Sequence, residues 1–288
     1  MSEALDNLVE LLDLETIEVN VYRGQHPAEA RQRTFGGQVA AQALIAAGRT
    51  VEDKRVHSLH SYFLRPGDPT TPILYEVDRI RDGRSFTTRR VVAIQHGRAI
   101  YNMQASFHND EVSLEHQMDM PDVPGPETVR PIHERVAEEW NDADEWFQRM
   151  HPIDQRFLGE LPWSPSRDHD PHQRLWIRAD GQLDDDQLLH AAVITYASDM
   201  SLMDVTLKPH HVRWDDGSFM GASLDHCMWF HRPVRADQWL LYDTDSPIAH
   251  GARGLARGFL FSQSGQLCVS LVQEGLTRVV DPAKHKPE

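Results

Sequence analysis

The sequence contains the same strand-rich pattern twice, and this repeat limits what the chain can fold into. Residues 58–66 resemble residues 225–233, because in both segments an alternating run with aromatic residues ends at an Arg-Pro pair. Proline cannot donate a hydrogen bond to a sheet, so it ends each strand. A second pair of segments, 89–97 and 257–265, keeps nearly the same offset and ends on a glycine that suits a hairpin turn. The sequence therefore predicts two copies of one β-rich unit.

Each copy also carries a helical segment upstream of its strands. Gly36-Gly37 opens a run of strong helix formers that extends to Gly48 and is apolar nearly all round. The second copy has a comparable run from Asp184 to Asp199, with acidic residues in its first turn, where the helix dipole favours them. Helices this apolar must be buried on most sides, as when a sheet wraps around them. The predicted fold class is therefore α+β.

The chain divides into three regions on this pattern. Residues 1–110 form the first repeat, residues 183–288 form the second, and residues 111–182 connect them. The connector begins with several prolines and then has the pattern of an acidic helix over residues 133–150, which includes two tryptophans. Because such aromatic side chains need a surface to cover, we expect an ordered connector rather than a free linker.

The composition argues against several classes of protein. The chain has 288 residues, with 29 Lys and Arg against 44 Asp and Glu, which gives a net charge of −15. Binding to nucleic acid or to an anionic membrane surface needs a positive field, so we expect neither. The acidic start is unlike a signal peptide, and the longest apolar stretch, 35–48, is too short to span a membrane. Only two cysteines occur, which fits a reducing compartment, so we expect a soluble cytoplasmic protein.

Standard catalytic motifs are missing from the sequence. It has no G-x-S-x-G nucleophile elbow, no phosphate-binding loop and no G-x-G-x-x-G after a strand. The 17 histidines include no H-E-x-x-H, and neither His57 with His60 nor the His210-His211 pair has Cys or carboxylate companions at ligand spacing. We therefore expect no metal site and no cofactor.

Three polar residues in the second repeat form a candidate catalytic group. Asp199 ends an apolar helix, where the helix dipole disfavours a carboxylate and partial burial would raise its pKa toward that of a useful base. Ser223 precedes the aromatic strand, and Gln273 lies near the end of the last strand, where the first repeat has Ala105. Each also fits an ordinary structural role, as a solvated helix end, a strand-entry hydroxyl and a sheet-edge amide. A repeat that has gained polar groups in one copy only would carry one site rather than two.

The sequence resembles the acyl-CoA thioesterase II (TesB-like) family. The matching segments are residues 33–38, 57–63, 222–226, 228–233 and 272–275. They spread over both repeats, so the resemblance covers nearly the whole chain. It implies a double hotdog fold, in which two repeats of an antiparallel β-sheet each wrap around a long central helix. This agrees with the repeat and the buried helices.

The resemblance also implies an activity, the hydrolysis of acyl-CoA thioesters to free fatty acid and CoA. The family's catalytic Asp, hydroxyl and Gln fall on Asp199, Ser223 and Gln273. A thioester carbonyl needs an attacking water, a group that takes its proton, and donors for the developing oxyanion. Our hypothesis is that Asp199 accepts the proton from a water held jointly by Ser223 and Gln273.

Acyl-CoA is the expected substrate partner, and two sets of residues are expected to bind it. Gly36, Gly37 and Gln38 are the first set, because backbone N–H groups near the two glycines would hold the thioester oxygen and glycine permits close approach. The CoA phosphates need local cations despite the negative net charge. Candidates for that role are Arg65, Arg84 and Arg89.

Two other functions stay open at this point. A hotdog-type enoyl-CoA hydratase would place an Asp and a His together, whereas Asp225 and His226, adjacent on a strand, would point to opposite faces. A non-catalytic acyl-CoA binding protein would leave Asp199 dispensable to binding. Sheets of this kind also expose edges that tend to be paired or covered, so we expect a homo-oligomer, a dimer or a tetramer.

Overall fold

The computed structural model describes residues 2–26, 33–139, 151–161, 164, 170–210, 212 and 219–280. The helices are α1 (Glu3–Leu12), α2 (Gly36–Gly48), α3 (Ile132–Glu139), α5 (Gln187–Ser198) and α6 (Asp204–Leu207), with the 3-10 turns η1 (Pro126–Thr128) and η2 (Lys208–His210). The strands are β1 (Glu15–Glu18), β2 (Val21–Gly24), β3 (Arg55–Phe63), β4 (Ile73–Asp82), β5 (Phe86–Gln95), β6 (Arg98–His108), β7 (Ile153–Leu158), β8 (His172–Ala179), β9 (Phe219–Ser223), β10 (Asp225–Phe230), β11 (Leu240–His250), β12 (Arg253–Ser262) and β13 (Leu267–Val279). Within these ranges, no helix combines the length and the apolar character that crossing a bilayer requires.

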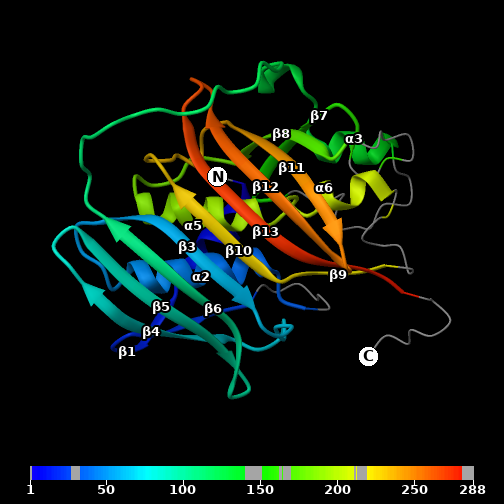
Figure 1. Cartoon of the computed structure of the whole chain (residues 1–288). Coiled ribbons are helices and arrows are strands. Elements are labelled where there is room, and N and C mark those ends of the chain that lie inside the picture. Colours follow the sequence, from blue (N-terminus) through cyan, green and yellow to red (C-terminus); the bar gives the residue numbers. More distant parts are fainter. Residues whose placement is uncertain are drawn as a thin grey trace.

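The strands form one antiparallel sheet whose two halves have the same strand order (Figure 1). From the outer edge inward, the order is β1-β2-β4-β5-β6-β3 in the first half and β7-β8-β11-β12-β13-β10 in the second. The halves meet where β3 pairs with β10, with Ser58 opposite Trp229 and Tyr62 opposite Asp225. The two segments whose sequences resemble each other are thus hydrogen-bonded to each other at the centre of the sheet. This confirms the repeat that the sequence predicted.

The glycines expected at hairpin turns lie where the sequence placed them. Gly97 joins β5 to β6 with a φ of 69°, and Gly265 joins β12 to β13 with a φ of 84°. Glycine adopts positive φ without steric cost, so these turns are fixed by sequence.

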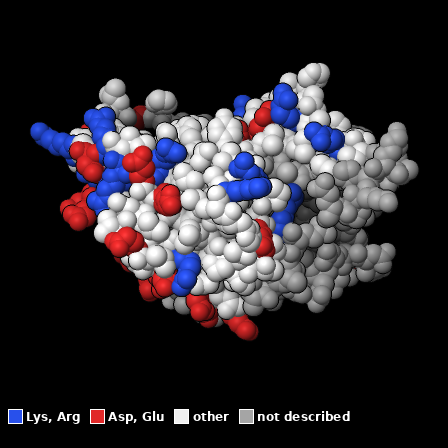
Figure 2. Space-filling model, turned by 90° about the horizontal axis from the view of Figure 1, so that it is seen from below, with Lys and Arg blue, Asp and Glu red and all other residues white. Residues whose placement is uncertain are grey.

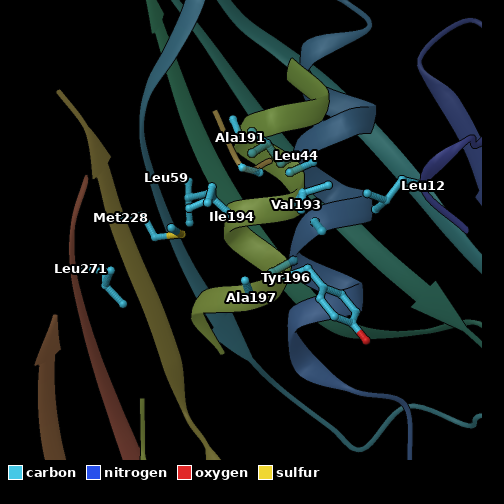
Figure 3. Packing of buried hydrophobic residues seen from close by; sticks show 14 of the residues in the cluster. Leu12, Leu44, Leu59, Ala191, Val193, Ile194, Tyr196, Ala197, Met228 and Leu271 are labelled. Carbon is cyan, nitrogen blue, oxygen red and sulfur yellow. The ribbon is translucent and has the colours of Figure 1, made fainter. Parts of the chain in front are cut away.

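Two apolar helices, α2 and α5, lie side by side inside the curve of the sheet (Figures 1 and 3). Helix α2 begins at Gly36 and ends at Gly48, as predicted. Helix α5 begins later than predicted, because Asp186 is its N-cap and accepts a hydrogen bond from the Leu188 N–H over 2.8 Å. The acidic run therefore precedes the helix rather than forming its first turn, which leaves the dipole argument intact.

The two helices run antiparallel and in close contact. A Cβ added to Gly48, at the end of α2, would lie 2.4 Å from Leu188 Cδ1, near the start of α5. At the other end of the pair, a Cβ added to Gly37 would lie 2.6 Å from the carbonyl oxygen of Tyr196. Small residues are therefore needed along this contact, and the alanine-rich sequences of both helices supply them.

The connector packs on the outside of the second half of the sheet. Trp176, Trp239, Leu241 and Phe261 form a small buried cluster there, which partly buried apolar residues between 120 and 129 cover. The Trp176 indole N–H donates to the carbonyl oxygen of Pro124 over 2.8 Å. The region 111–182 also contains strands β7 and β8, which extend the second half through pairing with β11. Helix α3 occupies the first part of the predicted helix 133–150, and residues 140–150 lie outside the described ranges.

Candidate active site

The structure brings Asp199, Ser223 and Gln273 into contact. Asp199 caps the C-terminal end of α5, Ser223 ends β9, and Gln273 lies on β13. Ser223 Oγ donates to Asp199 Oδ1 over 3.3 Å, and Gln273 Nε2 donates to the same oxygen over 2.6 Å. Strand β9 pairs with β13, with Ser223 opposite Gly275, so the sheet register places both donors at the end of α5.

The N-terminal end of α2 completes the surroundings of Asp199. The Gly37 N–H hydrogen-bonds the carboxylate, and a Cβ added to Gly36 would lie only 2.8 Å from Asp199 Oδ2. The carboxylate that ends α5 therefore faces the positive end of the antiparallel helix beside it, which offsets the unfavourable dipole of its own helix. The close approach of Asp199 and its surroundings explains why glycine occupies both positions.

Burial is the main influence on the pKa of Asp199 and raises it to about 6. Hydrogen bonds from Gln273, Gly37 and Ser223, together with the charge of Arg33, lower the pKa because they stabilise the ionised form. A carboxyl group with this pKa is ionised at neutral pH and is more basic than an exposed aspartate. Such a group is suited to general-base chemistry.

A cavity of about 530 Å³ opens beside these residues. Asp199 and Ser223 line it, whereas Gln273 is fully buried and contacts Asp199 from outside the lining. Most of the wall is apolar, and its larger side chains include those of Phe35, Val39, Phe63, Ile100, Phe157 and Met203. The site therefore combines one polar corner with an apolar chamber, as expected for a ligand with a reactive head and an aliphatic chain.

The residues predicted to bind substrate lie in different places. Gly36 lines the cavity, and the Gly37 N–H is engaged by Asp199. The Gln38 side chain is buried outside the cavity lining, and its Nε2 donates to the carbonyl oxygen of Gln25 over 3.3 Å. The structure thus brings Gly36 to the cavity but not the Gln38 side chain.

Of the three arginines considered for the CoA phosphates, only Arg65 lines the cavity. Arg84 lies at the exposed turn between β4 and β5, outside the lining. Arg89 is 1% exposed and donates to the Thr50 hydroxyl and carbonyl and to Asp82 Oδ1, so its predicted role in phosphate binding is wrong. The alternation of residues along β5 indicates that the Arg89 side chain is buried, because Arg89 is in phase with the buried Val91 and Ala93. Arg33 lines the cavity and was not singled out as a cation by sequence.

Asp225 and His226 point to opposite faces of β10, as their adjacency predicts. Neither side chain lines the cavity: His226 is fully buried, and Asp225 Oδ1 accepts the Glu274 N–H over 2.7 Å. The pair therefore does not supply the joint Asp–His site that a hydratase would use. In the described part of the chain, no group of three or more His, Cys, Asp or Glu side chains is arranged to hold a metal ion.

Two family models match the chain, one over each repeat. Residues 142–276 match the model described as acyl-CoA thioesterase, and residues 25–108 match the acyl-CoA thioesterase N-terminal domain. The second match includes α2 and β3 through β6, and the first includes β7 through most of β13.

Individual relatives agree with the family models. Human acyl-coenzyme A thioesterase 8 is 40% identical over 93% of this chain and 88% of its own. The crystal structure of an acyl-CoA thioesterase II, TesB2, from Mycobacterium marinum is 41% identical, covers 94% of this chain and 98% of that one, and superposes with a TM-score of 0.78. A protein with a hot dog fold from Alicyclobacillus acidocaldarius, 19% identical over 98% of this chain and 100% of its own, has a TM-score of 0.79 and confirms the predicted fold. This chain belongs to the acyl-CoA thioesterase family.

Proposed function

We propose that this enzyme, an acyl-CoA thioester hydrolase by family, uses Asp199 to activate the water that attacks the thioester. The observation that carries the proposal is the environment of its carboxylate. Asp199 lines the cavity, accepts hydrogen bonds from Gln273 and Ser223 on one oxygen, and has a pKa raised to about 6 by burial. A base held in one orientation and ionised at neutral pH needs no further activation.

The chemistry follows from this arrangement. Asp199 takes a proton from water as the water oxygen bonds to the thioester carbonyl carbon, which places a negative charge on the carbonyl oxygen. The tetrahedral intermediate then collapses, the carbon–sulfur bond breaks, and CoA leaves as a thiolate that takes up a proton. The products are a fatty acid and CoA. Ser223 donates to Asp199 rather than to a histidine, which favours a role in holding the water over direct attack.

The negative charge that develops on the carbonyl oxygen needs a hydrogen-bond donor close to that oxygen. Gly36 is the first residue of α2 and lines the cavity, and N–H groups in the first turn of a helix have no partner within it. We therefore assign the Gly36 N–H to the oxyanion, since the Gly37 N–H is engaged by Asp199. This places Gly36 and Gly37 in the same catalytic corner with different roles.

Recognition of the CoA phosphates depends on local cations rather than on overall charge. On the face drawn in Figure 2, blue and red residues are interspersed, in keeping with a net charge of −15. Arg33 and Arg65 both line the cavity and are the cations that we assign to the CoA portion of the substrate. The apolar chamber would then receive the acyl chain.

Thiol release from a panel of acyl-CoAs of increasing chain length tests the proposal. We expect Asp199→Asn to lower kcat by a factor of about 10² to 10⁴, because it removes the general base without changing its shape. Asp245→Asn is the matched control, since this aspartate on β11 pairs with Arg257 on β12 and lies outside the cavity lining. Normal turnover by Asp199→Asn would overturn the base assignment. Tight binding without thiol release by the unmodified enzyme would instead favour an acyl-CoA binding protein.

We also propose a cytoplasmic location and a homo-oligomeric state. Two free cysteines, Cys227 and Cys268, support a reducing compartment, and cell fractionation tests it. The outermost strands β1 and β7 leave sheet edges that a second copy would cover, which supports a dimer or tetramer. Light scattering on the purified protein would give the mass, and a monomer at micromolar concentration would refute the second part.

A further inference from the structure

His226 is a fully buried titratable residue that the mechanism above does not use. It lies on β10, one position before Cys227, which pairs with Val272 on β13, so His226 and Gln273 occupy the next facing positions of the two strands. Both side chains are completely buried. Burial lowers the pKa of His226 to about 4, so its ring is neutral at neutral pH.

Each of these two side chains has one buried polar atom without a partner. Neither His226 Nδ1 nor Gln273 Oε1 has a hydrogen-bond partner among the described residues, and the two side chains interact, since the Gln273 amide raises the pKa of His226. The remaining polar atoms of both side chains are engaged. His226 Nε2 lies 2.8 Å from Ser198 Oγ, and Gln273 Nε2 donates to Asp199.

The direction of each hydrogen bond follows from the carboxylate at the end of this chain of contacts. An ionised Asp199 can only accept, so Gln273 must present its NH₂ group to it. The amide oxygen of Gln273 then faces His226 and requires a donor, which makes Nδ1 the protonated nitrogen of the ring. Because the ring is neutral, Nε2 carries no proton and accepts from the Ser198 hydroxyl.

The opposite assignment leaves groups unsatisfied. Ser198 Oγ also lies 2.9 Å from the carbonyl oxygen of Thr195, and its single hydrogen could point there. His226 would then carry its proton on Nε2, and the lone pair of Nδ1 would face the amide oxygen of Gln273. A flip of the amide would relieve that contact only by turning its oxygen toward the Asp199 carboxylate. Both arrangements bury opposed acceptors, which is costly.

We propose that His226 is a positioning residue for the hydrolytic reaction: as the Nδ1–H tautomer, held by Ser198, it fixes the orientation of the Gln273 amide and thereby keeps an N–H on Asp199. The proposal rests on the assignment of Asp199 as the base. Its consequence is a directed relay from Ser198 through His226 and Gln273 that stabilises the ionised carboxylate. None of the side chains of Ser198, His226 and Gln273 lines the substrate cavity.

Two substitutions distinguish a role of His226 in orienting Gln273 from a role in packing alone. In His226→Asn the amide nitrogen can take the place of Nδ1 and donate to Gln273, whereas in His226→Gln the longer side chain places its amide near Nε2 and Ser198. We expect His226→Asn to keep kcat within about threefold, and His226→Gln to lower kcat by about 10- to 100-fold with KM nearly unchanged, as for one lost hydrogen bond in a charged network. Equal losses in the two variants would overturn the proposal.

The pH profile adds a readout that packing would not move. Gln273 lowers the pKa of Asp199, so loss of its orientation should raise that pKa and shift the acid limb of kcat to higher pH in His226→Gln. Among the described residues, the other charged or titratable groups that act on Asp199 are Arg33, Tyr101 and Tyr242, and none is altered by the substitution. An acid limb that stays in place would contradict the relay.

Nitrogen NMR of the unmodified protein tests the tautomer without any turnover. With ¹⁵N-labelled histidine, and with His226 assigned by its disappearance in His226→Asn, we expect a neutral ring protonated on Nδ1 and unchanged between pH 8 and pH 5.5. A ring protonated on Nε2 would overturn the proposal whatever the kinetics. The tautomer does not depend on catalysis. If Asp199→Asn proved active, Asp199 would no longer be assigned as the base, but the NMR measurement would still test the hydrogen-bond directions proposed for His226 and Gln273.

Discussion

The two ends of the α2–α5 helix pair are built on one plan and differ in a few polar side chains. At one end α5 stops at Asp199, which meets the start of α2 beside a cavity of about 530 Å³. At the other end α2 ends at Gly48, with Arg49 as its C-cap, and Gly48 meets Leu188 of α5 beside a second cavity of about 720 Å³. The C-cap residue of the helix is therefore an aspartate, Asp199, in one repeat and an arginine, Arg49, in the other. On the proposed mechanism, catalytic capacity depends on local side chains and not on the duplicated frame.

Buried polar groups serve different purposes in the two halves. In the second half Gln273 donates to a carboxylate on the cavity wall, whereas the aligned residue of the first half is the buried Ala105. The first half instead uses Arg89 and Thr50 to join β5 to the segment that follows α2. The second half buries an acid that we propose as the catalytic base, and the first uses its buried polar groups to hold the fold together.

The largest effect that we expect in this comparison is on the stability of the first half. Arg89→Ala should lower the free energy of unfolding by about 3–5 kcal/mol, because it leaves the partners of a buried guanidinium unsatisfied. The specific activity of the folded fraction should change little. Denaturant unfolding measures the loss, and the control is Arg90→Ala, the exposed neighbour on β5, which should stay within about 0.5 kcal/mol.

Making the second half more like the first should abolish most of the activity. Gln273→Ala introduces the residue type that the first repeat has at this position, and we expect kcat to fall by about 100-fold, as for one lost donor to the reacting system. In the unmodified enzyme kcat should fall as the pH drops through about 6, because Asp199 must be ionised. The substitution should move that limb to higher pH, since Gln273 lowers the pKa of Asp199.

The control for this change lies in the first half. Gln104 is an exposed amide beside Ala105 on β6, and Gln104→Ala should leave both kcat and its pH profile unchanged. A similar loss of activity in the two variants, or an unmoved acid limb in Gln273→Ala, would show that the amide supports the fold rather than Asp199.

The glycines at the two ends of α2 give the next comparison. A Cβ at Gly37 would lie 2.6 Å from a backbone oxygen, whereas a Cβ at Gly48 would meet the flexible end of the Leu188 side chain. We expect Gly37→Ala to cost about 2–3 kcal/mol of stability and most of the activity, and Gly48→Ala to cost about 1 kcal/mol with activity kept. Thermal unfolding and thiol release on both variants measure this, and equal effects would mean that the two ends are packed alike.

Local patterns were enough to predict the repeat, the two buried helices and the hairpin glycines, whereas the grouping of Asp199, Ser223 and Gln273 came from the family resemblance. The β7–β8 hairpin escaped prediction, because it lies inside a segment rich in turn and charged residues. The position of Asp199 could not be explained locally either: a carboxylate at a helix C-terminus is stabilised here by the N-terminus of another helix, a contact between residues far apart in sequence.

Two further residues, His226 and Arg89, have surroundings that were not predicted from the sequence. His226 was correctly expected on the face opposite Asp225, but alternation alone does not say which face is inside or that Gln273 is the neighbour there. Arg89 was a candidate for binding the CoA phosphates, although the buried phase of β5 includes it. For His226 the missing information is strand register, which only the assembled sheet supplies, whereas for Arg89 the alternation along β5 already indicated burial.

The smallest effect that we expect concerns the cost of keeping Asp199 ionised. Its pKa rises from 3.8 in an unfolded chain to about 6 in the folded enzyme, so the folded state binds the proton more tightly and its stability falls as the pH rises from about 4 to 6. Above that range the cost is complete and constant. Asp199→Asn removes it and should stabilise the enzyme by about 1 kcal/mol at pH 8, after allowance for screening by water in the cavity, and by less at pH 5. Unfolding free energies at the two pH values measure this. A variant less stable than the unmodified enzyme at pH 8 would mean that the hydrogen bonds to the carboxylate outweigh its desolvation, and the contrast between the two halves in their use of buried polar groups would then fail.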